Sequence, residues 1–283
     1  MKKGINIWAF PRTLALEDCL QAAARAGFAG IELAYSLDGP IGPESSRAQM
    51  ETLRARAADL GLALPSLASG VLWRCNLVSD DPAERAQAQH HVRKQLELAH
   101  YLGADTVLVV PGVIGTAEAP EPAVADYAVA YERGVAALRD LARVAEEYGV
   151  AIGVENVWNR FLTGPLELRD FVDAVGHPLV GVYFDVGNVL KVGYPEQWIR
   201  LLGPRIKKVH VKDFRLGVGT LRGFVELLEG DVNFPAVMAA LRAIGYRDYL
   251  IAELPPRRHA PLATVERAAR DLDLILAMSG PGA

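Results

Sequence analysis

The sequence is poor in cysteine, in long apolar runs and in net charge, and each shortage excludes a class of protein. Of 283 residues only Cys19 and Cys75 are cysteines, without CxxC spacing, which excludes a disulfide framework or a thiolate zinc site. No stretch approaches the about 18 apolar residues of a membrane-spanning helix, and the opening residues contain no apolar run of signal-peptide length. We therefore expect a soluble, cytoplasmic protein.

The charge balance gives no sign of a nucleic-acid partner. The formal net charge is −4 and the sequence pI is about 5.9, so no overall basic surface is expected. The composition is 51% hydrophobic and 23% charged, as in globular proteins with a large core. No low-complexity segment or linker divides the chain. We expect a single domain over residues 1–283 whose partner is a small molecule.

A pattern of short apolar run, polar loop and longer amphipathic segment recurs along the chain. The apolar runs, each expected to be a strand, are residues 4–10, 29–33, 62–68, 105–112, 150–156, 180–188, 206–213 and 248–254. Helices are expected at residues 16–26, 46–60, 82–101, 124–148, 165–175, 195–202, 234–245 and 262–278. Alternating strands and helices indicate a parallel sheet, and eight such units predict an α/β fold of the (β/α)8 TIM-barrel type. A doubly wound open sheet is the alternative, although no GxGxxG follows the first strand.

Four successive predicted strands end in residues that can bind a metal. Glu155 lies in "GVEN", Asp185 in "VYFDVGN", His210 in "KVHVKD" and Glu253 in "IAEL". The active site of a TIM barrel lies at these carboxyl ends of the strands. Carboxylates gathered there would repel one another and raise each other's pKa, which a divalent cation would prevent. Oxygen and imidazole ligands suit Mn²⁺, Mg²⁺, Co²⁺ or Zn²⁺. Taken singly, each residue has an alternative as a paired glutamate or a core histidine.

The order of these motifs resembles one family. "VEN", "FDVGN", "HVKD" and "AEL", with "GFAGIEL" and "LLEGDVNFPAVMAALRAIGY", look like the sugar-phosphate isomerase/epimerase superfamily of xylose-isomerase-like TIM barrels. Within it, the chain is most similar to ketose 3-epimerases and L-ribulose-5-phosphate 3-epimerase-like proteins. The resemblance implies an isomerase that holds one divalent metal ion, with Mn²⁺ first among the candidates. Homodimers or homotetramers are common in the families it resembles.

The resemblance also implies residue roles. Glu155, Asp185, His210 and Glu253 would bind the metal. Glu155 and Glu253 would exchange protons through a metal-bound enediolate, one removing the proton next to the carbonyl and the other returning it to the opposite face. A dehydratase acting on an inosose or keto-polyol with the same ligands is an alternative. An endonuclease IV-like nuclease is a further alternative, disfavoured because the other histidines do not lie at strand ends.

Loop residues near these strand ends are candidates for substrate binding. They are Trp8, Glu32, Trp158, Asn188, Lys212 and Arg215. Lys212 would share the side of its strand with His210, because side chains alternate along a strand. Phe161 and Asn188 stand where free-ketose epimerases carry glutamate and histidine, so a sugar phosphate, a cyclic polyol or an acid sugar stays open. The glycine-rich segment 213–224 is expected to be a mobile loop over the barrel mouth, with Arg215 and Arg222 as candidate anion ligands.

Overall fold

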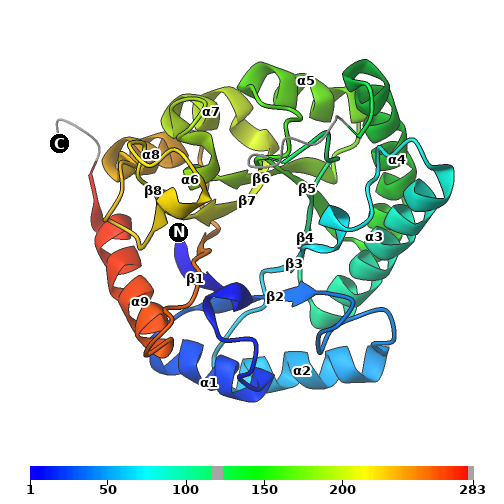
Figure 1. Ribbon diagram of the computed structural model, residues 1–283. Coiled ribbons are helices and arrows are strands. Elements are labelled where there is room, and N and C mark those ends of the chain that lie inside the picture. The colour runs from blue at the N-terminus through cyan, green and yellow to red at the C-terminus, as the bar shows by residue number, and fades with distance from the viewer. Residues whose placement is uncertain (117–123, 280–283) are drawn as a thin grey trace.

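The computed structural model describes residues 1–116 and 124–279. Within these residues eight parallel strands close into a barrel, in the order β1-β10-β7-β6-β5-β4-β3-β2 (Figure 1). The strands are β1 (Lys2–Asn6), β2 (Gly30–Tyr35), β3 (Ser66–Ser69), β4 (Thr106–Val109), β5 (Ala151–Glu155), β6 (Val180–Asp185), β7 (Ile206–Val211) and β10 (Tyr249–Ala252). The predicted (β/α)8 barrel is confirmed, and the open-sheet alternative is excluded.

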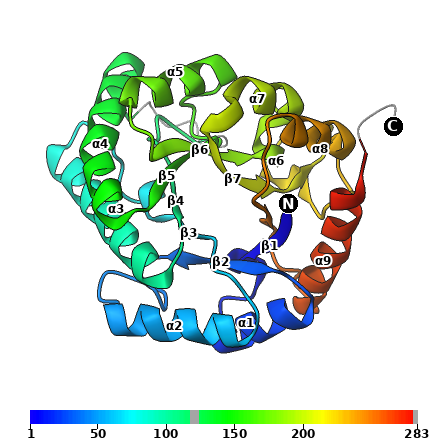
Figure 2. The same ribbon diagram turned by 180° about the vertical axis from the view of Figure 1, so that it is seen from behind.

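Helices surround the barrel, as both views show (Figures 1 and 2). They are α1 (Leu16–Arg25), α2 (Arg47–Asp59), α3 (Pro82–Leu102), α4 (Tyr127–Tyr148), α5 (Pro165–Val175), α7 (Pro195–Leu202), α8 (Phe234–Ala243) and α9 (Leu262–Ala277). Helix α3 begins where its sequence predicts: the Asp81 carboxylate accepts the N–H of Ala83 at 2.8 Å. It ends at Gly103, whose φ of 75° lies in the left-handed region that glycine adopts without a Cβ penalty. No helix in the described ranges has the length and apolar character needed to cross a membrane.

The outer side of the barrel wall is stabilised by apolar packing, and the interior contains polar pairs. Strand β5 shows the first, since Ile152 and Val154 are fully buried. At the amino-terminal end of the barrel, the buried Lys208 ammonium lies 2.7 Å from Asp105 and also pairs with Asp248. This second arrangement satisfies a charge that would otherwise be costly in the interior. Another polar cluster lies at the carboxyl end of the same barrel.

Three short elements at the barrel mouth were not predicted. After β6 the chain forms α6 (Val186–Val189), and β8 (Asp213–Phe214) pairs antiparallel with β9 (Phe224–Val225). The buried Asp213 carboxylate accepts the N–H groups of Phe214, Gly230 and Val232 at 2.8, 2.9 and 3.1 Å. The segment 213–224, expected to be a mobile loop, therefore begins and ends in paired strands, because Asp213 supplies acceptors that the glycine count does not reveal.

Candidate metal centre and active site

The barrel brings the four predicted metal ligands together. Glu155 and Asp185 end β5 and β6, His210 lies opposite Asp185 on β7, and Glu253 directly follows β10. Each of the four side chains offers one ligand atom, and these atoms all lie within 4.8 Å of one another. Parallel strands that stay in register place their carboxyl ends at the same rim. Glu155 and Glu253 are about a hundred residues apart in the sequence, and the barrel topology brings them together.

Several polar atoms of this cluster take part in ion pairs but make no hydrogen bond. Among the described residues, four buried side-chain atoms have no hydrogen-bond partner, and three of them are Asp185 Oδ2, His210 Nδ1 and Glu253 Oε2. Such atoms are rare in native interiors because each loses its hydration. His210 Nδ1 lies 2.9 Å from Glu253 Oε2, 3.9 Å from Glu155 Oε1 and 4.0 Å from Asp185 Oδ2. Three carboxylates and one imidazole that converge in this way fit a divalent cation.

The two glutamates have unlike electrostatic surroundings. Burial raises the pKa of Glu155 to about 7. Burial acts in the same direction on Glu253, but Lys212 and His210 outweigh it and hold the pKa of Glu253 below its usual value. The Lys212 ammonium lies 3.1 Å from Glu253 Oε2 and 3.2 Å from Asp185 Oδ2. Unlike environments for two carboxyl groups are typical of sites in which they exchange protons with a substrate.

Two asparagines fix the orientation of Asp185. The Asn156 side chain accepts the Asp185 N–H and donates to the Asp185 carbonyl, both at 2.8 Å. The Asn188 N–H donates to Asp185 Oδ1 at 2.7 Å, and the Asn188 amide donates to the Asn156 carbonyl at 2.9 Å. Hydrogen bonds that orient a ligand in this way raise metal affinity. The sequence predicts that Asn188 contacts substrate. In the structure its buried amide already binds the Asn156 carbonyl, so Asn188 supports Asp185 instead.

Glu32 lies beneath the cluster, inside the barrel. Its fully buried carboxylate accepts the Ser66 hydroxyl at 2.6 Å and also the Tyr183 hydroxyl and the Asn6 amide. It lies 2.6 Å from His210 Nε2, so His210 turns Nδ1 toward the other carboxylates. The prediction that Glu32 binds substrate is not supported, because an inward-facing β2 side chain at this depth reaches His210 rather than the barrel mouth.

Burial alone would lower the pKa of His210, but Glu32 and Glu253 outweigh it and raise this pKa well above its usual value. A divalent cation at Nδ1 would favour the deprotonated ring. Glu32 remains the partner of Nε2 in either case. His210 therefore directs Nε2 to Glu32 in the barrel interior and Nδ1 to the candidate metal centre.

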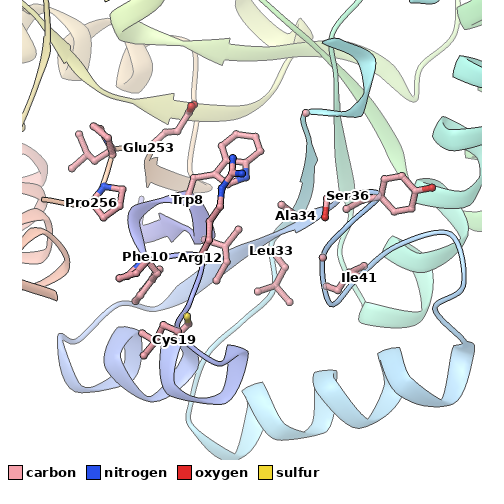
Figure 3. A pocket seen from close by; sticks show the side chains of 18 of the residues that line it. Trp8, Phe10, Arg12, Cys19, Leu33, Ala34, Ser36, Ile41, Glu253 and Pro256 are labelled. Carbon is pink, nitrogen blue, oxygen red and sulfur yellow. The ribbon is translucent and has the colours of Figure 1, made fainter. Parts of the chain in front are cut away.

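A cavity of about 820 Å³ borders the candidate metal centre at Glu253. The predicted residues Trp8 and Lys212 line it, and Figure 3 shows Trp8 and Arg12 extending into it from the segment after β1. Five further polar residues line it that the sequence patterns did not identify: Arg12, Tyr35, Ser36, Asp38 and Arg74. Tyr35 ends β2, and the others follow β1, β2 or β3 at the same end of the barrel, so the rule that places active sites there would have found them.

Trp158 and Arg215 lie away from this cavity. Trp158 packs against the rings of Phe214 and Phe224, with centroids 5.2 and 5.1 Å away, and its indole N–H donates to the Asn188 carbonyl at 2.9 Å. It borders a separate cavity of about 260 Å³. The half-exposed Arg215 donates to the Glu229 carbonyl at 3.0 Å. Their predicted substrate contacts are not supported for the larger cavity, because the β8–β9 hairpin directs both side chains elsewhere.

Residues 20–276 match the model of one protein family, the xylose isomerase-like TIM barrels. The chain belongs to this family. An L-ribulose-5-phosphate 3-epimerase of Salmonella paratyphi C is 26% identical over 95% of this chain and 94% of its own length. A protein of Methanocaldococcus jannaschii, named only as MJ1311, is 30% identical over 55% of this chain, which spans about half (52%) of that relative. The resemblance found in the sequence is confirmed, and the predicted enzyme class, an isomerase, agrees with the epimerase name.

Solved xylose isomerase-like barrels share the fold. A D-psicose 3-epimerase determined in the presence of D-fructose superimposes with a TM-score of 0.81, at 23% identity, over 98% of this chain and 99% of its own. The IolI protein with a bound zinc atom gives a TM-score of 0.81 at 20% identity, over 98% of each chain. At these identities the likeness concerns the barrel itself.

Proposed function

We propose that this protein is a divalent-metal-dependent isomerase that inverts the carbon next to the carbonyl of a small ketose or ketose phosphate. The observation that carries the proposal is the convergence of Glu155 and Glu253 on one cluster with Asp185 and His210, beside a cavity large enough for a sugar. The epimerase name of the Salmonella relative supports it. We propose Mn²⁺ as the metal and the cytoplasm as the location.

Each side chain has a task in this reaction. A divalent cation held by the four residues would supply Lewis-acid stabilisation of the negative charge that develops on substrate oxygens. One of the two glutamates removes the proton next to the carbonyl, and the other returns a proton to the opposite face of the carbon. Glu253 lines the cavity and meets the substrate directly. The Lys212 ammonium beside it balances the carboxylates and lines the same cavity.

The alternatives have less support. A dehydratase would use the same ligands, but a relative that matches nearly the whole chain is named an L-ribulose-5-phosphate 3-epimerase. A nuclease with several zinc ions needs several histidines, whereas within residues 1–116 and 124–279 the cluster able to hold a metal contains a single one, His210. The geometry therefore favours proton transfer on a small molecule.

Solvent isotope exchange tests the proposal. The Mn²⁺-loaded protein is incubated in deuterated water with a panel of ketoses and ketose phosphates, and products are followed by NMR. We expect an inverted product that carries deuterium at the carbon next to the carbonyl. Glu155→Gln and Glu253→Gln should each abolish exchange, while Glu44→Gln, an exposed control, leaves it unchanged. Turnover without deuterium incorporation, or no exchange with any sugar, would refute the proton-transfer scheme.

A further inference from the structure

The charged residues that line the 820 Å³ cavity do not balance. In the described chain they are three cations, Arg12, Arg74 and Lys212, and two carboxylates, Asp38 and Glu253. Arg74 pairs with Asp38 at 3.0 Å, and Lys212 pairs with Glu253 at 3.1 Å. Each carboxylate in the lining is thus matched by a cation. Arg12 is left over.

Arg12 has no partner among the residues that the structure describes. The neighbouring residues in the cavity wall make ion pairs and hydrogen bonds, but none of these involves the Arg12 guanidinium. Its side chain extends beside Trp8 into the cavity, while Glu253 enters from the segment after β10 (Figure 3). A guanidinium presents a planar fork of donors that matches a phosphate or a carboxylate in a bidentate manner. An unmatched fork in a ligand cavity is suited to an anionic part of the ligand.

The size of the cavity leaves room for such a group. About 820 Å³ lies toward the upper end of the about 300–1,000 Å³ typical of small-molecule sites. A carbonyl carbon and its neighbour at Glu253 occupy only one side of this space. The remaining carbons of a sugar can extend along Trp8 toward Arg12.

Building on the proposed function, we propose that the substrate carries a terminal anionic group, a phosphate or a carboxylate, that pairs with Arg12 while its reacting carbons lie at Glu253. This moves the anion site from Arg215 and Arg222, which the sequence suggested, to the segment after β1. Arg215 is engaged with Glu229 at 3.0 Å, and neither of these two arginines lines the cavity.

Binding to matched sugars tests the inference without requiring turnover. The Mn²⁺-loaded protein is titrated calorimetrically with D-tagatose, D-tagatose 6-phosphate and D-tagaturonate, which share one carbon skeleton, and with L-ribulose and L-ribulose 5-phosphate. We expect an anionic member of a set to bind ~10-fold more tightly than its neutral counterpart. An advantage for the phosphates alone identifies a phosphate site, and an advantage for tagaturonate as well identifies a site for any terminal anion.

Variants assign the advantage to Arg12. Arg12→Gln should remove it and leave the affinity for the neutral sugar unchanged, whereas Arg12→Lys should keep part of it. Arg25→Gln, on the exposed surface of α1, removes the same charge far from the cavity lining and should bind as the wild type does.

Equal affinities within each set, no binding of any anionic sugar, or an advantage that survives in Arg12→Gln would overturn the inference. Binding and exchange fail separately. If anionic sugars bind through Arg12 but never exchange deuterium, the proposed function is wrong and the anion site stands. If neutral sugars alone are epimerised, the proposed function stands and the anion site at Arg12 is wrong.

Discussion

Replacing Glu32 with glutamine tests the support beneath the candidate metal centre. The wild-type carboxylate accepts hydrogen bonds from Ser66, Tyr183 and Asn6 and lies 2.6 Å from His210 Nε2. A glutamine side chain replaces one acceptor oxygen with an amino group that can only donate. At least one buried donor is then left facing another donor. Glu32 is fully buried, so water does not reach the group to compensate.

The size of the effect follows from this burial. Removing one partner of a buried charged pair costs ~3–5 kcal/mol of unfolding free energy. In a chain of this length each kcal/mol lowers Tm by roughly 2 °C, so Tm should fall by about 6–10 °C. His210 also loses the partner that fixes Nε2, and loss of such a partner weakens metal binding by ~10–100-fold.

Two assays on the purified variants measure these effects: thermal unfolding by circular dichroism and Mn²⁺ titration by calorimetry. Glu44→Gln is the matched control, because Glu44 is exposed in the loop after β2. A surface change of this kind stays within about 0.5 kcal/mol. If Glu32→Gln unfolds at the temperature of the control and binds Mn²⁺ as tightly as the wild type does, Glu32 does not hold His210 in place.

Three further predictions concern other parts of the molecule. Asn156→Ala should weaken Mn²⁺ binding ~10–100-fold in a calorimetric titration, because Asp185 loses two hydrogen bonds that orient it; unchanged affinity would count against the supporting role. Gly230→Ala should lower the unfolding free energy by ~1–3 kcal/mol in a urea titration, because a Cβ there would lie 2.2 Å from Asp213 Oδ1; a stability equal to that of wild type would contradict the packing. Burial raises the pKa of Cys19 to about 11, so native Cys19 should stay largely protonated at pH 8 and react with iodoacetamide far more slowly than in urea, with a rate that rises as the pH approaches 11; equal rates by mass spectrometry would be the contrary result.

The sequence predicted which four side chains converge because the barrel obeys a simple rule. Glu155, Asp185 and Glu253 each end an apolar run, and parallel strands deliver their ends to one rim. The prediction needs only the alternation of strands and helices. It therefore holds even when each element boundary is misplaced by a few residues. His210 follows from the same rule, one residue before the end of β7.

The direction of side chains could not be predicted in the same way. The predicted second strand ends at residue 33, which would place Glu32 at the rim, but β2 continues to Tyr35 and Glu32 lies deeper, where it meets His210. Trp158 and Arg215 were assigned to the substrate because they follow ligands in the chain. The β8–β9 hairpin, held by Asp213, turns them elsewhere. Such contacts depend on loop paths that no periodic pattern encodes.

The strongest single check on the account is the metal content of the protein. The chain is dialysed to equilibrium against Mn²⁺ and analysed by plasma mass spectrometry, alongside a variant with Asp185→Asn and His210→Gln. Because one ligand atom from each of four side chains converges within 4.8 Å, we predict one ion per wild-type chain and a large loss of binding in the variant. Absence of tightly bound metal in the folded wild-type protein, or equal binding by the variant, would contradict the metal centre on which the proposed function depends.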